Sequence, residues 1–92
     1  MRNLLVILSD EHRFDAMGCA GHDFVQTPHL DSLASRSLRF TNAYTPSPIC
    51  VPARAAFATG RYVHQTGHWD NACPHTGTPR GWGHQLQDAG IP

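Results

Sequence analysis

The chain contains no lysine and no long hydrophobic run, and it has few charged residues. Seven arginines balance seven acidic residues in 92 positions, so the formal net charge is zero. A protein that binds nucleic acid needs a basic patch, and this sequence predicts none. Apolar residues still make up 40% of the chain, which excludes a disordered, solvating tail. The length and composition predict one small domain with a modest core.

Membrane and disulfide signals are also scarce. The apolar run LLVIL at residues 4–8 is too short to span a bilayer or to serve as a secretory signal, and the polar residues SDEH follow it at once. Three cysteines at irregular spacing do not predict a disulfide framework. We therefore expect a soluble, cytoplasmic protein that has no membrane partner.

The first half of the chain alternates between strand-like and helix-like patterns. The segment NLLVILSD at residues 3–10 is almost continuously apolar, which is typical of a parallel strand covered on both faces. The segment RFTNAY at residues 39–44 predicts a second, shorter strand. Between them, Thr27 as N-cap and Pro28 begin the clearest helix, whose apolar residues continue at helical spacing to Leu38.

The second half predicts two helices separated by a long loop. The segment TPSPICVP at residues 45–52 predicts a proline-stiffened loop, and ARAAFATG at 53–60 predicts a helix that ends at its glycine. Residues 63–81, rich in His, Gly and Pro, predict a loop before a last helix at 81–90. Two strands cannot form a covered sheet. We therefore expect residues 1–92 to be the incomplete N-terminal part of a larger α/β domain.

The stretch SPICVPARAAFATGRY raises the main chemical question, because a loop becomes a helix there. The first N–H groups of a helix lack intrahelical partners and attract anions. Pro52 suits the first turn because its missing N–H is not needed there, and Arg54 can direct its guanidinium to the same anion. Cys50 is then a candidate nucleophile. A cysteine phosphatase loop would need arginine at the position of Ala56, so we exclude that class.

The pattern CVPAR is a complete match to the sulfatase signature Cys-x-Pro-x-Arg. The segment TPHLDSLASRSLRFTNAYT is similar to the pattern TPNLD.LA..G..F.N.Y of the same family. The chain therefore resembles the N-terminal part of a type I sulfatase over nearly its whole length, and most resembles the choline-sulfatase-like members. The resemblance implies an alkaline-phosphatase-like α/β fold, with a mixed or parallel sheet flanked by helices.

The resemblance also implies a reaction. A formylglycine-generating enzyme would oxidise Cys50 to formylglycine, whose aldehyde hydrates to a geminal diol. One hydroxyl would attack the sulfur of a small-molecule sulfate ester and release the alcohol. The other would then lose its proton, expel sulfate and restore the aldehyde. Arg54 would hold the modified residue and the bound anion, and Pro52 and Arg54 belong to the signature that the modifying enzyme recognises.

A divalent cation, usually calcium, completes the site that the resemblance implies. It polarises the sulfate and lowers the pKa of the diol, and modified Cys50 would be one of its ligands. Asp10 matches the first metal ligand of the family. Glu11 stands where the family has aspartate, or glutamine in the phosphonate hydrolases, and its carboxylate can also bind a hard cation. Calcium takes roughly six to eight oxygen ligands, so the other ligands are expected beyond Pro92.

Several other interpretations stay open. The same site could serve a phosphonate monoester or phosphodiester hydrolase, or the chain could be an inactive remnant, and we expect these 92 residues alone to be inactive. A structural zinc module is a further alternative, although its four candidate ligands match no tight finger spacing. These ligands are Cys19, His22, Cys73 and His75.

Further polar residues are expected in exposed loops, although HWDNA at 68–72 could border the substrate pocket. They are His12, Arg13, His64, His68, Asp70 and Asn71.

Overall fold

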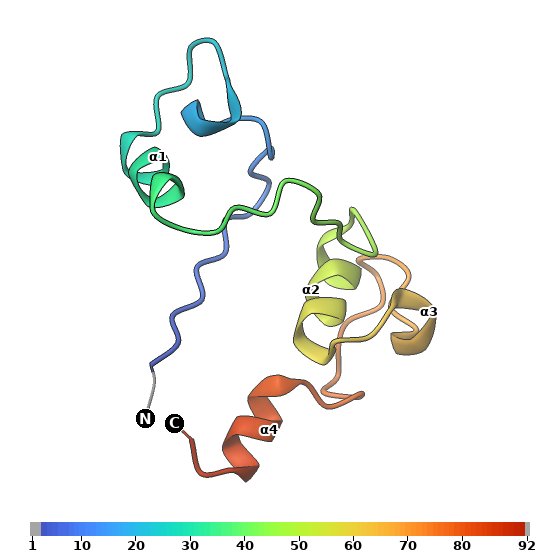
Figure 1. The fold of residues 1–92 in the computed structure, drawn as a ribbon. Coiled ribbons are helices and arrows are strands. Elements are labelled where there is room, and N and C mark those ends of the chain that lie inside the picture. Colours follow the sequence, from blue (N-terminus) through green and yellow to red (C-terminus); the bar gives the residue numbers. More distant parts are fainter. Residues whose placement is uncertain (1–2, 92) are drawn as a thin grey trace. The chain divides into compact units, whose positions relative to one another are not determined.

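The computed structural model describes residues 3–91, and the chain divides into two compact units, Met1–Thr41 and Asn42–Pro92. Each unit is described by itself. The first contains the 3₁₀ turn η1 (Gly18–Ala20) and helix α1 (Pro28–Ser35), and the second contains α2 (Cys50–Thr59), α3 (Val63–Thr66) and α4 (Trp82–Asp88) (Figure 1). Within residues 3–91, no helix is long and apolar enough to cross a membrane.

The two predicted strands, residues 3–10 and 39–44, do not form, and the described part of the chain contains no strand. A strand is stabilised by hydrogen bonds to a neighbouring strand, and neither segment pairs in this way. The apolar side chains of the first segment consequently face solvent, with Leu4 88% exposed and Ile7 82% exposed. Residues 3–91 therefore contain the helices of the predicted α/β pattern but not its sheet.

Helix α1 begins as the sequence predicts and ends earlier. Thr27 is its N-cap residue and Pro28 its first helical residue, but the helix stops at Ser35 rather than reaching Leu38. The hydroxyl of Ser37 donates to the carbonyl of Leu33 at 2.7 Å. This local bond competes with continuation of the helix, as expected for a serine beside a helix end.

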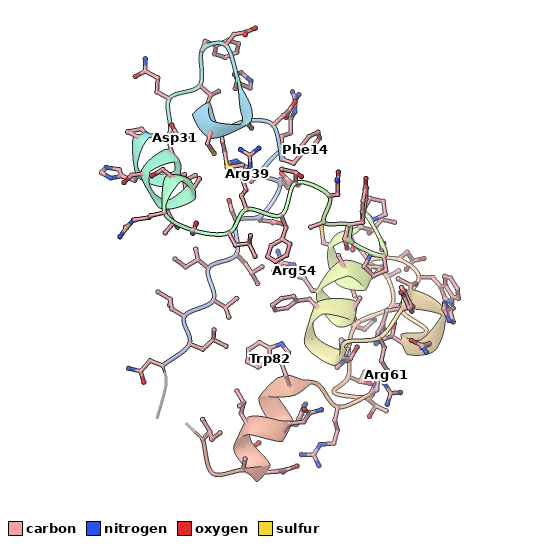
Figure 2. The ribbon with its side chains drawn as sticks, viewed as in Figure 1. Phe14, Asp31, Arg39, Arg54, Arg61 and Trp82 are labelled. Carbon is pink, nitrogen blue, oxygen red and sulfur yellow. The ribbon has the colours of Figure 1, made fainter. Side chains whose placement is uncertain are left out.

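The carboxylate of Asp31 joins α1 to η1. It accepts hydrogen bonds from the N–H of Cys19 at 2.7 Å and from the hydroxyl of Thr27 at 2.9 Å, while that hydroxyl accepts from the N–H of Gly18. Arg39 donates to the carbonyl of Cys19, and Figure 2 shows Asp31 and Arg39 beside this turn. A side chain at Gly18 would overlap the Asp31 carboxylate, so this packing requires glycine. Polar contacts, rather than a buried apolar core, hold η1 to α1.

Helix α2 is the centre of the second unit. It begins at Cys50, three residues before the predicted start, and ends at Gly60, whose φ of 66° is the left-handed conformation expected of a glycine C-cap. Pro52 lies inside the first turn, where no intrahelical N–H is required. The predicted loop at 45–52 therefore ends three residues too late.

Small side chains on α2 allow the neighbouring helices to approach. Ala55 and Ala56 are buried, and both α3 and α4 contact this helix. Trp82, the first residue of α4, meets Phe57 edge to face at 6.3 Å between ring centroids. Its neighbour Gly81 has no space for a side chain, because a Cβ would lie 2.5 Å from the carbonyl oxygen of Ala58. Helix α4 therefore packs closely against α2 at Phe57 and Ala58.

Candidate active site

Cys50 is the first residue of α2, and its thiol is free and exposed. The preceding residue, Ile49, is extended, with φ −104° and ψ 142°, and its N–H donates to the hydroxyl of Ser47 at 3.2 Å. The side chain of Cys50 therefore stands at the positive end of a ten-residue helix. An anion bound at this end would meet the partial positive charge of the helix and the cysteine together.

Of the other two signature residues, one is buried and one is exposed. Pro52 is among the most buried side chains, with less than 2% exposed. Arg54 is exposed and projects from α2 (Figure 2). Residues four apart on a helix lie on the same side, so Arg54 shares a side of α2 with Cys50. The sequence prediction that these two residues act together is thus compatible with the helix geometry.

Asn71 is the residue that sequence reasoning undervalued. It lies in an exposed loop, as predicted, and its side-chain carbonyl accepts the N–H of Val51 at 2.9 Å, across 20 positions of sequence. Val51 is the second residue of α2, so Asn71 satisfies one of the N–H groups beside Cys50. The available signal was the HWDNA segment at 68–72, which was predicted as a possible border of the substrate pocket.

Asp10 and Glu11 lie in the first unit, in a turn after the extended apolar segment, and both are exposed. Cys50 and Arg54 lie in the second unit, so the structure describes the two pairs separately. Glu11 has φ 56°, a left-handed conformation that costs a residue with a side chain roughly 1–2 kcal/mol. Strain of this kind is often found at functional positions.

Asp10 and Glu11 provide the kind of ligand that calcium prefers. Two adjacent carboxylates supply hard oxygen donors, which is the ligand type that calcium prefers. Two residues are too few to provide all of its ligands. No group of three or more His, Cys, Asp or Glu side chains able to hold a metal occurs within residues 3–91. That finding also covers the zinc alternative, whose cysteine and histidine ligands are not gathered into such a group.

A bidentate ion pair follows the two carboxylates. Arg13 contacts Asp15 through Nη2 at 2.6 Å and Nε at 3.0 Å. The hydrogen bond from Arg13 is the main reason that the pKa of Asp15 lies below its usual value. Arg13 lies in an exposed loop, as predicted.

A groove of about 500 Å³ runs along another side of α2. Ala53, Ala56 and Phe57 line it together with residues 43–46 and 60–62. Cys50 and Arg54 do not line this groove, so it is separate from the candidate active site.

Comparison with known proteins identifies the family. The sequence profile of the sulfatase family matches residues 2–91, so the chain belongs to the sulfatase family. Membership implies the alkaline-phosphatase-like α/β fold, of which the described residues show helices and no strand. No solved structure matches this one.

Curated relatives with sulfatase names agree with this assignment. The chain is 39% identical over 88 residues to the choline-sulfatase of Rhizobium meliloti, and these cover 96% of the chain and 17% of that protein. It is 35% identical to the N-acetylglucosamine-6-O-sulfatase of Bacteroides thetaiotaomicron, covering 96% of the chain and 16% of that protein. It is 46% identical over 65 residues to human arylsulfatase A, covering 71% and 13%. The chain thus spans about a sixth of these relatives or less.

Proposed function

We propose that the protein to which this chain belongs hydrolyses sulfate monoesters, with Cys50 as its nucleophile after oxidation to formylglycine. The observation that carries the proposal is the position of Cys50 as the exposed first residue of α2, within a complete Cys-x-Pro-x-Arg pattern. Membership of the sulfatase family supports the class of reaction.

Each signature residue has a physical role in this proposal. The N-terminus of α2 presents partial positive charge to the sulfate. Arg54 donates hydrogen bonds to the sulfate oxygens, because its planar guanidinium suits paired acceptors. Pro52, which is buried, fixes the first turn while leaving no N–H unsatisfied. Asn71 accepts a hydrogen bond from the N–H of Val51. This bond fixes the first turn of α2, which contains Cys50.

Asp10 and Glu11 would contribute two oxygen ligands to a divalent cation, calcium by family resemblance, and Cys50 in its modified form would contribute another. When bound, such a cation polarises the sulfate and favours loss of a proton from the nucleophile. The strained backbone of Glu11 supports a functional role for this turn.

The proposed substrate is a small-molecule sulfate ester, and the proposed partner is a formylglycine-generating enzyme. Relatives named for choline sulfate and N-acetylglucosamine-6-sulfate chemistry define two substrates to test first. We also propose a reducing, cytoplasmic compartment, a proposal that the free thiols of Cys19, Cys50 and Cys73 support.

Mass spectrometry of the peptide that contains Cys50 tests this function. After co-expression with a formylglycine-generating enzyme in the presence of dioxygen, the peptide should lose one sulfur and two hydrogens and gain one oxygen. The variant Arg54→Ala should reduce the yield, because it removes part of the recognised signature, whereas Arg61→Ala, just after the same helix, should not. Unmodified Cys50 beside a fully converted control substrate would contradict the proposal. Hydrolysis of a phosphonate monoester by the modified full-length enzyme, measured beside hydrolysis of a sulfate ester, distinguishes the alternative phosphonate hydrolase activity from the sulfatase activity.

A further inference from the structure

His68 is a buried polar residue in a segment where the sequence predicts exposed side chains. Only 8% of it is exposed. Its Nδ1 lies 3.2 Å from the carbonyl oxygen of Cys73, and because a carbonyl can only accept, Nδ1 must carry the hydrogen. The ring of His75 lies 4.9 Å away between centroids. His68 therefore uses its ring as a fixed donor inside the loop.

The hydrogen bond from His68 encloses a tight turn. The N–H of Cys73 donates to the carbonyl of Asp70 at 3.3 Å, and the N–H of Ala72 donates to the Asp70 carboxylate at 2.8 Å. Asn71 is the second residue of this turn, and its side chain accepts the N–H of Val51 at 2.9 Å. A continuous series of contacts thus leads from the buried ring to the first turn of α2.

We propose that His68 is a positioning residue for Cys50. His68 donates to the carbonyl of Cys73 and so fixes the turn that contains Asn71. The side chain of Asn71 then holds the N–H of Val51, the residue that follows Cys50 in the chain. The inference rests on the proposed function only for what Cys50 does chemically. The geometric claim stands apart from it.

The second nitrogen of His68 shows which property of histidine is used. The Nε2 atoms of His68 and His75 are both buried and have no hydrogen-bond partner in the structure, an unfavourable state for polar atoms. The presence of histidine at position 68 is therefore not explained by a hydrogen bond of its Nε2. An asparagine places its amide nitrogen near the position of Nδ1, so His68→Asn keeps the donor and removes the unpaired atom.

A metal bound between the two rings explains the geometry less well. His75 accepts the N–H of Gly77 through Nδ1 at 3.0 Å, so the proton of its neutral form is on Nε2. A protonated nitrogen cannot bind a metal ion. The two unpaired nitrogens are thus a donor on His75 and an acceptor on His68.

Hydrogen exchange at the amide of Val51 tests the proposal. This N–H is in the first turn of α2 and has no intrahelical acceptor, so its protection reports the bond to Asn71. In the ¹⁵N-labelled chain, His68→Leu should increase its exchange rate about fivefold, the effect of one net hydrogen bond. The amides of Ala55–Thr59, further along the helix, should keep their rates. Asn71→Ala should reproduce the effect, His68→Asn should restore protection, and His64→Leu, at an exposed histidine, should change nothing.

Other outcomes would overturn it. Unchanged protection of Val51 in His68→Leu would remove His68 from this role. A uniform loss along α2, or a failure of His68→Asn to restore protection, would make His68 an ordinary packing residue. Protection that needs added zinc would favour a metal site instead. The yield of formylglycine at Cys50 is measured separately, so a failure of the proposed function leaves the exchange result intact, and the reverse also holds.

Discussion

At the scale of single residues, Cys50 and Glu11 occupy positions that their side chains alone do not explain. Cys50 begins α2 without a side-chain hydrogen bond from its N-cap residue Ile49. The polar side chains of Ser47 and Asn71 instead bind N–H groups on either side of it. Glu11 holds a left-handed conformation that glycine, asparagine or aspartate adopts at lower cost. Cys50 is thus positioned by two side chains that bind the backbone N–H groups beside it.

The strain at Glu11 gives a prediction for stability and metal binding. Glu11→Gly should raise the free energy of unfolding by up to about 1 kcal/mol, because glycine adopts the left-handed conformation without a steric penalty. The greater conformational entropy of glycine in the unfolded chain offsets part of this gain. Glu11→Gln should leave stability nearly unchanged. Both variants should weaken calcium binding, measured by calorimetry on the full-length protein, since each removes a carboxylate. A less stable Glu11→Gly would show that the conformation is not strained.

At the scale of elements, the contact between η1 and α1 depends on one carboxylate. Asp31 accepts two hydrogen bonds, and the bond from the Cys19 N–H is the main reason that its pKa is lowered from 3.8. A lowered pKa in the folded state means that the ionised carboxylate stabilises the fold. That stabilisation is present above the unfolded value and is lost as the pH falls through the folded one.

Asp31→Asn should therefore lower the denaturation midpoint at pH 7, and the difference from the wild type should shrink as the pH falls below 3.8. Denaturation curves followed by circular dichroism at several pH values measure both effects. Asp23→Asn, an exposed carboxylate in the same unit, is the matched control and should change little. A difference from wild type that stays constant down to pH 2 would rule out the ionised carboxylate as the cause.

Helix α2 shows how local signals and packing combine at this scale. Gly60 ends the helix as the sequence predicts, because a glycine C-cap is a local feature. The start at Cys50 falls inside the predicted loop at 45–52, whereas the prediction that Pro52 suits a first turn agrees with its position in α2. The N–H of Val51 finds its partner 20 residues away, and no local pattern contains that information.

At the scale of the whole molecule, apolar exposure is the dominant feature. The side chains of Leu4, Leu5 and Ile7 are each more than four-fifths exposed, and Pro52, Ala55 and Ala56 are among the few buried apolar residues. Contiguous exposed apolar surface is usually covered by a further element or a partner. In an α/β sheet, neighbouring strands and helices would provide that cover.

This exposure predicts that the 92-residue chain binds a hydrophobic dye such as ANS. Replacing Leu5 and Ile7 by asparagine should lower the dye fluorescence, because these residues belong to the exposed run at 4–8. Helix content by circular dichroism should stay unchanged, since the run lies outside every helix. Absence of dye binding by the wild type would mean that these side chains are covered in solution.

The sequence by itself determined the signature around Cys50, the family, the start of α1 at Pro28 and the end of α2 at Gly60. These features are local, because motifs, caps and prolines act within a few residues of themselves. The tertiary structure alone decided that Asn71 reaches the helix of Cys50, that His68 is buried, and that residues 3–10 form no strand. Such features depend on contacts between distant parts of the chain. A hydrogen bond across 20 residues, or a strand that needs a neighbour, has no signal in the pattern of either partner alone.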